Sequence, residues 1–395
     1  MKCIPFSIAA LLIAVHCLAE TPHPLFFGAP GDDFSGWIDG RIHLDAAHYF
    51  EGKNRLDSGT DLRRVRLGVH AILYRSWEAE IDINLAGDEV DVDDTWIAYR
   101  NRTKKIKVGA FKEPFGLERL TSSRYLLFAE RSMASEALAP GRKIGLQISQ
   151  AGTHWYAAAG FFGQEGDETA AGDDEAVALT GRFVYRPIDE TERRLHLGLA
   201  LTRRTPNATA SGSHQVRFRT FPETRVSNRR YLNTGRVSQV DYTESIGFEG
   251  GLTTGPLFLQ GEYLYTAVHR GAGYSDLALG GGYVAGAWIL HGGRRGYLAT
   301  EGEFGPVVTS SHDGAWELAL RYSTLDLSDF AGPVMGGTTR HATLGLNWYA
   351  NPLIRALFNI TLVDNDEFAD GGSPSGSLVG DDDYSFIHLR LQAHF

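Results

Sequence analysis

Residues 384–395 read YSFIHLRLQAHF and alternate between apolar and polar side chains as far as the carboxyl end. The apolar positions are Ile387, Leu389, Leu391, Ala393 and Phe395, and the polar ones are His388, Arg390, Gln392 and His394. A period of two is typical of a β-strand with one apolar and one polar face. A strand of about ten residues with lipid on one side and a polar lumen on the other is the unit of a transmembrane β-barrel. An edge strand of a soluble sheet would show the same alternation, so the remaining sequence must decide between the two.

The same alternation recurs along the chain. Between Trp77 and Leu85 the odd positions are apolar, whereas Glu78, Glu80 and Asp82 occupy even positions. A basic residue facing lipid near the midplane costs about 2–4 kcal/mol, so the charged registers are expected to face a lumen. Sixteen strands are predicted in this way, near residues 37–49, 65–73, 77–85, 92–100, 105–112, 142–150, 153–162, 176–186, 194–203, 237–252, 256–268, 277–290, 314–326, 339–349, 353–363 and 384–395. For the thirteenth of these strands, 297–304 is the alternative to 314–326.

The connections between these strands alternate in length. Short turns are predicted near 75–76, 101–104, 187–193, 253–256 and 351–352, and longer loops at 51–60, 114–141, 163–175, 204–236, 327–338 and 364–383. Turns on one side and loops on the other are typical of an up-and-down outer-membrane barrel, whose even strand count places both termini in the periplasm. A β-propeller is not expected, because the sequence has no repeat of fixed period. The predicted fold is therefore all-β, a 16-stranded antiparallel transmembrane barrel.

The first residues have the pattern of an export signal. Lys2 precedes an apolar run, and the small residues Cys17 and Ala19 suit cleavage before Glu20. We therefore expect a signal peptide at 1–19, a short periplasmic lead at 20–35 and a barrel domain at 36–395. Both cysteines, Cys3 and Cys17, fall in the signal peptide, so no disulfide is expected in the exported protein.

Composition and motifs exclude several other classes of protein. No run approaches the roughly 18 apolar residues of a membrane-spanning helix, and a closed sheet is the other structure that satisfies its backbone in lipid. The net charge of −10 gives no indication of nucleic-acid binding. No spacing of catalytic or metal-ligating residues is present, so we predict no enzyme activity, metal or cofactor. The run Asp381–Asp383 is interpreted as a solvated loop, with a calcium or lipid-bridging site as the alternative.

Two stretches are rich in arginine in an otherwise acidic chain. The stretch 111–142 carries Arg119, Arg124 and Arg131 among hydroxyl residues, and the stretch 203–236 carries eight arginines and one acidic residue, Glu223. The planar guanidinium group suits phosphate and carboxylate oxygens, and selectivity requires several such charges to converge in a constriction. Alternatively, these arginines bind lipopolysaccharide phosphates or form a solvated face. Glu78, Glu80 and Asp82 weaken a uniformly positive pore and could pair across strands with Arg64 and Arg66.

Four segments together resemble the phosphate-selective porin family, the phosphate and pyrophosphate porins. The first is KVGAFKEPFGLE at 107–118, continued by Thr121–Ser123 and Glu130–Arg131. The others are DLRRVR at 61–66, DDTW at 93–96, and AWILHG at 287–292 with the following Arg295, Tyr297 and 302–304. The resemblance extends over nearly the whole exported chain.

This resemblance implies a homotrimer of 16-stranded barrels in the bacterial outer membrane, with loop 3 folded into the lumen. The connection 291–313 would be an inward-folded periplasmic segment. The family's site favours a lysine where Arg119 stands, which keeps the charge but changes the contact geometry. The implied anion-binding residues are Arg63, Arg64, a carboxylate at Asp93 or Asp94, Arg119, Ser122, Ser123 and Arg131. The candidates for an arginine ladder above this site are Arg203, Arg217, Arg219, Arg225, Arg229 and Arg230.

The sequence therefore predicts an outer-membrane channel for passive diffusion of small anions, phosphate or polyphosphate, through an arginine-lined constriction. Its expected partners are inorganic phosphate or other small anions, outer-membrane lipid and lipopolysaccharide, and two further copies of the chain, with no nucleic acid. One alternative is a general, carboxylate- or sugar-permeable porin. Another, from a different class, is an outer-membrane barrel enzyme or adhesion protein.

Overall fold

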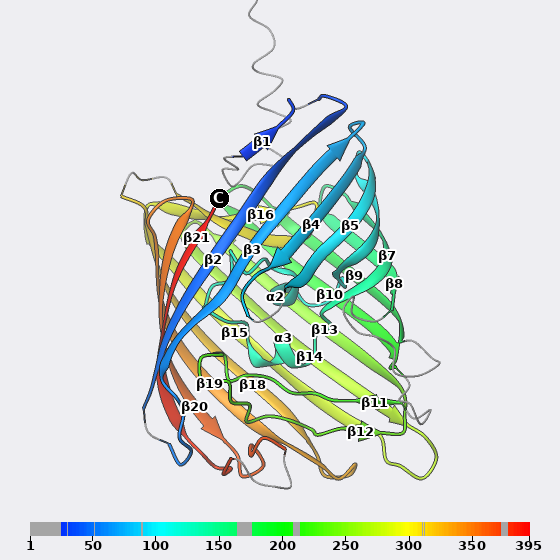
Figure 1. The fold of residues 1–395 in the computed structure, drawn as a ribbon, viewed down its shortest axis with the longest axis vertical. Coiled ribbons are helices and arrows are strands. Elements are labelled where there is room, and N and C mark those ends of the chain that lie inside the picture. The colour runs from blue at the N-terminus through cyan, green and yellow to red at the C-terminus, as the bar shows by residue number, and fades with distance from the viewer. Residues whose placement is uncertain are drawn as a thin grey trace, which may run out of the picture.

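Sixteen antiparallel strands form a closed barrel in the computed structural model (Figure 1). The structure describes residues 25–29, 31–50, 52–87, 90–163, 176–207, 214–309, 311, 313–372 and 378–395, and the predicted signal peptide with its cysteines lies outside these ranges. The barrel strands are β2 (Phe34–Phe50), β3 (Gly59–Leu73), β4 (Trp77–Asn84), β5 (Asp91–Asn101), β6 (Lys104–Lys112), β7 (Arg142–Ala151), β8 (Trp155–Phe162), β9 (Val177–Asp189), β10 (Arg193–Thr205), β13 (Val240–Thr254), β14 (Leu257–Arg270), β15 (Leu277–His291), β18 (Ala315–Asp329), β19 (Val334–Tyr349), β20 (Ile354–Asn365) and β21 (Tyr384–His394). All sixteen predicted strands are confirmed, including the choice of 314–326 over 297–304.

The carboxyl-terminal strand closes the barrel. β21 pairs with β20 on one side and with β2 on the other. Beyond β21, Phe395 and Gly40 exchange two backbone hydrogen bonds of 3.1 Å each. A Cβ atom at Gly40 would lie only 2.5 Å from the Phe395 ring, so glycine leaves the space that the terminal aromatic ring fills. The stretch 384–395 therefore has the role that its alternation predicts.

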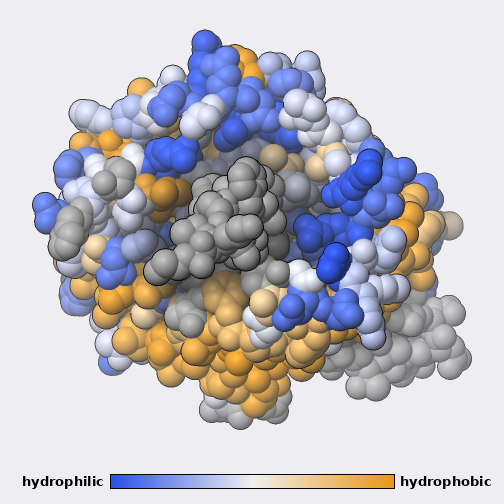
Figure 2. Space-filling model, turned by 90° about the horizontal axis from the view of Figure 1, so that it is seen from above, coloured by the Kyte–Doolittle hydropathy of each residue, from blue (hydrophilic) through white to orange (hydrophobic). Residues whose placement is uncertain are grey.

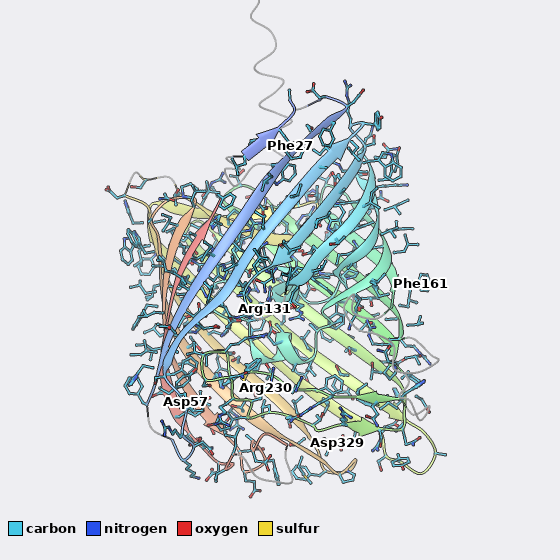
Figure 3. All side chains as sticks on the ribbon, in the orientation of Figure 1. Phe27, Asp57, Arg131, Phe161, Arg230 and Asp329 are labelled. Atoms are coloured by element: carbon cyan, nitrogen blue, oxygen red, sulfur yellow. The ribbon has the colours of Figure 1, made fainter. Side chains whose placement is uncertain are left out.

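The two faces of the barrel wall differ as the charged registers predict. In β21, Leu391 is 51% exposed on the outside, whereas the neighbouring Arg390 is 2% exposed and points inward. Figure 3 shows the same contrast between Phe161, which projects from the outer wall, and Arg131, which lies within the barrel. Seen from the end that carries the carboxyl terminus, hydrophilic residues gather at the rim and hydrophobic residues cover the visible flank (Figure 2). The outer face thus presents apolar side chains to lipid.

A β-bulge turns two consecutive arginines inward. His43 of β2 pairs with Arg64 of β3, but the next residue, Leu44, pairs with Leu62, so Arg63 is the extra residue. Leu62 is 49% exposed on the outer face, whereas Arg64 is buried. An extra residue in one strand leaves the strict alternation and re-aims a side chain. Arg63 therefore faces the lumen beside Arg64, where a period of two alone would have put it in lipid.

Several shorter elements connect or extend the barrel strands. We call residues 113–141, between β6 and β7, loop 3; it contains α2 (Leu117–Leu120) and α3 (Met133–Ala137). We call residues 214–239, the described part of the connection between β10 and β13, loop 5; it contains β11 (Gln215–Val216) and β12 (Val237–Ser238). β1 (Leu25–Phe27), within the predicted lead, pairs with β2. None of the described helices is long and apolar enough to cross a membrane.

A hairpin of β16 (Gly293–Leu298) and β17 (Glu303–Thr309) connects β15 to β18. It contacts inward-facing side chains of strands that are distant in sequence. The Tyr297 hydroxyl and His196 Nδ1 of β10 form a hydrogen bond of 2.8 Å, and Arg182 Nη2 of β9 donates to the Gly302 carbonyl at 2.8 Å. These contacts place the hairpin inside the wall, as expected for the connection 291–313.

Candidate functional site

Loop 3 is attached to strands other than the two that carry it. Ala129 donates its backbone N–H to Asn359 Oδ1 of β20 at 3.0 Å, and Arg355 Nη1 of β20 donates to the Leu126 carbonyl at 2.7 Å. Further bonds reach loop 3 from β14, β18, β19 and β21, through Glu262, Arg321, Asn347 and Arg390. Since these side chains face inward, the contacts fix loop 3 against the inner wall (Figure 1).

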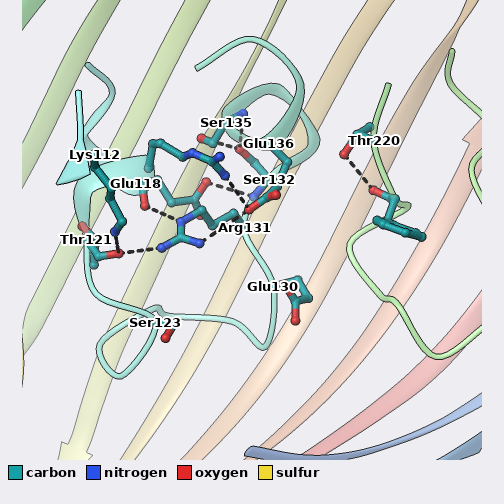
Figure 4. A network of polar contacts seen from close by, with 12 residues as sticks. Lys112, Glu118, Thr121, Ser123, Glu130, Arg131, Ser132, Ser135, Glu136 and Thr220 are labelled. Atoms are coloured by element: carbon teal, nitrogen blue, oxygen red, sulfur yellow. Dashed lines mark hydrogen bonds and ion pairs between the residues drawn. The ribbon is translucent and has the colours of Figure 1, made fainter. Parts of the chain in front are cut away.

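Basic side chains also hold the backbone of loop 3 together (Figure 4). Arg131 donates from Nε to the Glu118 carbonyl and from Nη2 to the Thr121 carbonyl, both at 2.7 Å. Lys112 donates from Nζ to the Leu120 carbonyl at 2.8 Å. Arg131 is thus a structural residue of the loop, with its Nη1 left to meet Glu136 at 3.5 Å.

All seven residues predicted to bind an anion line one cavity of about 450 Å³. They come from β3, β5 and loop 3, so the fold gathers residues that are distant in sequence. Asp93, the alternative carboxylate, lines the same cavity. The seven are Arg63, Arg64, Asp94, Arg119, Ser122, Ser123 and Arg131.

The two arginines of the β3 bulge meet a carboxylate of loop 3. Arg63 donates to both oxygens of Glu130, from Nε at 2.8 Å and from Nη2 at 3.2 Å. Arg64 Nη1 lies 3.7 Å from Glu130, and Arg390 of β21 also pairs with it at 2.6 Å. Burial opposes ionisation of Glu130, but these guanidinium groups outweigh it and hold its pKa well below the usual range. Glu130 is therefore an ionised anchor that joins loop 3 to the wall.

Arg41 is a residue of this cavity that the sequence analysis missed. Its Nη1 donates to Ser123 Oγ at 3.2 Å and to Ser122 Oγ at 3.4 Å, and its Nη2 pairs with Asp82 at 3.0 Å. Arg41 lies in the inward register of β2, so the alternation could have identified it. Five further basic residues line the cavity although they were not among the predicted anion-binding residues: Arg66, Lys107, Lys112, Arg124 and Arg142.

The cavity also carries acidic side chains, which pair with several of its arginines. Asp82 lies 3.9 Å from Arg66, as the sequence predicts, and Asp94 accepts from Arg142 Nη2 at 2.6 Å. Glu78 pairs instead with Arg100 and Lys105 at 2.7 and 2.8 Å. The further acidic lining residues are Glu80, Asp91, Asp93, Glu136, Glu301 and Glu303. The lining is thus basic in excess but mixed in sign.

Loop 5 places three of the ladder candidates at a second cavity of about 180 Å³, lined by Arg219, Arg225 and Arg230 together with residues of loop 3. The guanidinium groups of Arg225 and Arg230 lie 4.7 and 3.7 Å from the centre of the Phe221 ring. Burial, with the nearby Arg219 and Arg225, lowers the pKa of Arg230 to about 10, so it stays cationic at neutral pH. These three arginines form a basic surface next to loop 3.

The other three ladder candidates line neither cavity. The position of Arg203 corrects the prediction that it belongs to an arginine ladder inside the barrel. Arg203 shares the outer face of β10 with Leu201, pairs with Glu244 at 3.2 Å and stacks on Tyr242 at 3.9 Å. Arg217 donates to Asn233 at 2.8 Å within loop 5. Arg229 is not among the described residues that line either cavity.

The acidic run at 381–383 joins loops. Asp382 accepts from the Asn54 backbone N–H at 3.1 Å and from the Tyr231 hydroxyl at 2.6 Å. Asp383 accepts from the Asn365 backbone N–H at 3.0 Å, and Asp381 pairs with Lys53 at 2.7 Å. The three carboxylates therefore bind separate partners instead of converging on one point.

The sequence matches one protein family, and the structure is similar to those of several outer-membrane barrels. The sequence profile of the family "phosphate-selective porin O and P" matches residues 37–395. Porin O of Pseudomonas aeruginosa is 26% identical over 400 residues, which cover 92% of this chain and 89% of Porin O. OmpT, an outer membrane protein of Vibrio cholerae, has a similar structure with a TM-score of 0.60 at 10% identity, covering 95% of this chain and 100% of OmpT. An anion-selective porin from Comamonas acidovorans has a TM-score of 0.57 at 14% identity, covering 92% of this chain and 100% of that porin.

Proposed function

Because this chain belongs to the phosphate-selective porin O and P family, we propose that it forms a channel through which phosphate or polyphosphate diffuses passively. The family and the fold place the protein in the bacterial outer membrane. They also support an anion channel over an enzyme. The preferred anion and the residues that select it are the proposed part.

The observation that carries the proposal is the cavity beside loop 3. Arg63, Arg64, Arg119 and Arg131 line it with two serine hydroxyls, and Arg225 extends the basic surface toward loop 5. Guanidinium groups and hydroxyls are donors suited to phosphate oxygens. In our proposal loop 3 is the inward-folded constriction, and an anion moves from the arginines of loop 5 to those of loop 3. Such sites must bind well enough to admit the anion and weakly enough to release it.

A porin without phosphate preference is the second candidate function. It is favoured by the carboxylates Glu80, Asp82 and Asp94, which line the same cavity and neutralise part of its charge. Mixed charge of this kind would pass carboxylates, sugars or general solutes with little discrimination. Vesicle swelling rates with sugars, compared with phosphate uptake, separate these two functions.

Assembly and surroundings are part of the proposal as well. The apolar outer wall suits contact with outer-membrane lipid and lipopolysaccharide, and with neighbouring copies in a homotrimer. One structure of the Vibrio cholerae relative is described as a trimer form. Native gel electrophoresis of the purified protein, with and without heating, tests this assembly.

Planar-bilayer recordings test the proposed function. In a potassium chloride gradient we expect a reversal potential whose sign shows that chloride passes more readily than potassium. We also expect inorganic phosphate to block the chloride current. Arg131→Ala should weaken the phosphate block because Arg131 both orders loop 3 and contributes a cation. Cation preference, or chloride current unaffected by phosphate, would contradict the proposal.

A further inference from the structure

Three side chains lie at the junction of the two cavities. Arg131, Glu136 and Arg225 line both the cavity of about 450 Å³ and the one of about 180 Å³. Arg131 and Glu136 belong to loop 3, whereas Arg225 belongs to loop 5. An anion that passes from one cavity to the other must therefore move along these three side chains.

Glu136 is the acidic member of this junction, and three arginines converge on it. Its carboxylate lies 3.2 Å from Arg119, 3.5 Å from Arg131 and 3.2 Å from Arg225. Burial opposes its ionisation, but the three guanidinium groups outweigh this and lower its pKa to about 2. Glu136 is thus a carboxylate ion at neutral pH, held as an oxyanion from solution would be held.

Glu136 differs from the other carboxylate of loop 3 in its access to the cavity. The side chain of Glu136 is 18% exposed and that of Arg225 is 36% exposed, whereas the side chain of Glu130 is 3% exposed. Glu130 also pairs with Arg390 of β21, which anchors it to the wall. Glu136 has its ion-pair partners only on the two loops among the described residues, so its place on the arginines can be taken by another anion.

We propose that Glu136 is a tethered counter-ion that occupies the arginine site at the junction and is displaced there by the permeating oxyanion. This rests on the proposed anion channel. An oxyanion from the cavity of about 180 Å³ takes the place of the carboxylate on Arg119, Arg131 and Arg225. Return of Glu136 to the same arginines then promotes release into the cavity of about 450 Å³. The carboxylate therefore weakens binding and speeds passage, which a row of unopposed arginines would not do.

Glu136→Gln tests this proposal because it keeps the shape of the side chain and removes its charge. The concentration of inorganic phosphate that halves the chloride current should fall about tenfold, since an opposing unit charge at about 4 Å is lost. The phosphate current at saturation should fall as well, because release becomes slower. An unchanged or weakened phosphate block would overturn the proposal. The matched control is Glu244→Gln, which removes a carboxylate paired with Arg203 on the outer face and should change neither quantity.

A second pair of variants keeps the test decisive if loss of one buried charge impairs folding. Glu136→Gln/Arg225→Gln removes one charge of each sign, so the junction keeps its net charge. Compared with Arg225→Gln alone, the double variant should bind phosphate about tenfold more tightly. If Glu136 served only to hold the loops together, the double variant would bind phosphate more weakly than either single variant.

Recordings of the wild type beside these variants separate a failure of the proposed channel from a failure of the proposed role of Glu136. A wild type without anion preference or phosphate block overturns the proposed channel and this inference with it. A wild type with both properties, whose Glu136→Gln variant has no tighter block, overturns the inference alone.

Discussion

Loop 3 and the β16–β17 hairpin both contact inward-facing side chains of the barrel wall, but their own side chains have different roles. Loop 3 turns arginines toward a cavity, and its Glu136, which is partly exposed, pairs with Arg119 and Arg131 of the same loop and with Arg225 of loop 5. The hairpin packs Phe304 against Phe258, with ring centres 4.8 Å apart, next to a fully buried pair of Arg182 and Glu249. Charges that are partly exposed to a cavity can meet an ion, whereas fully buried charges stabilise the fold. Substitutions of charges that line the cavity should therefore alter ion passage, and those of the buried pair beside the hairpin should alter stability.

The largest effect is expected for Glu249→Ala. Glu249 accepts three hydrogen bonds from Arg182, of 2.7, 2.8 and 3.1 Å, and one from His196. Removing one partner of a buried pair costs about 3–5 kcal/mol. We expect a large loss of unfolding free energy, measured by denaturant titration of the heat-modifiable gel band, with the ion preference retained. Glu244→Gln on the outer face should cost less than about 1 kcal/mol. Equal losses of unfolding free energy in the two variants would show that buried and exposed ion pairs contribute equally to stability.

A smaller effect on stability but a clear effect on ion passage is expected for Arg63→Gln. Glu130 keeps Arg64 and Arg390 as partners, so loop 3 stays in place, but one cation of the cavity is lost. The phosphate concentration for half block should rise about tenfold. Bilayer recordings measure this change, and loss of folded protein instead would show that Arg63 is chiefly structural.

The pH dependence of ion preference should differ between the two regions. Burial, reinforced by Glu301 and opposed by Arg182, raises the pKa of Glu303 in the hairpin to about 7, whereas the pKa of Glu136 is about 2. As the pH rises from 6 to 8, Glu303 gains a negative charge, so the preference for chloride should fall slightly. Glu303→Gln should remove this step, and Glu136→Gln should leave it in place. If this change in ion preference disappeared only in Glu136→Gln, the titrating group would be Glu136 and not Glu303.

The lowered pKa of Glu136 also predicts the direction in which stability changes with pH. Its pKa is lowered from 4.5 to about 2 on folding, so its ion pairs contribute fully above about pH 4.5 and are lost as the pH falls toward 2. Loop 3 should therefore become accessible to an acid-active protease only near pH 2. Cleavage within loop 3 that begins at pH 5 would contradict this assignment.

The smallest effect is expected for Arg203→Ala. Arg203 lies on the outer face, 61% exposed, and an exposed pair is worth at most about 1 kcal/mol. Neither the reversal potential nor the phosphate block should change in bilayer recordings. A loss of anion preference in this variant would place Arg203 on the ion path after all.

The alternation of apolar and polar residues predicted the strands and most of the lumen-facing side chains. It could also have excluded Arg203, which shares its register with Leu199 and Leu201. It could not place Arg63, because a bulge is an exception to a period of two. Nor could it pair Glu130 and Glu136 with arginines of other segments, since those contacts depend on how loops 3 and 5 lie against the wall. The resemblance to a family supplied the seven lining residues, and spacing alone would not have grouped them.

Whether the arginine-lined cavity selects anions is tested most directly by the reversal potential of the wild-type channel in a potassium chloride gradient, repeated with inorganic phosphate added. We expect anion preference and a chloride current that falls as phosphate fills the arginine-lined cavity. A cation-selective current that phosphate leaves unchanged would show that the cavity does not select anions.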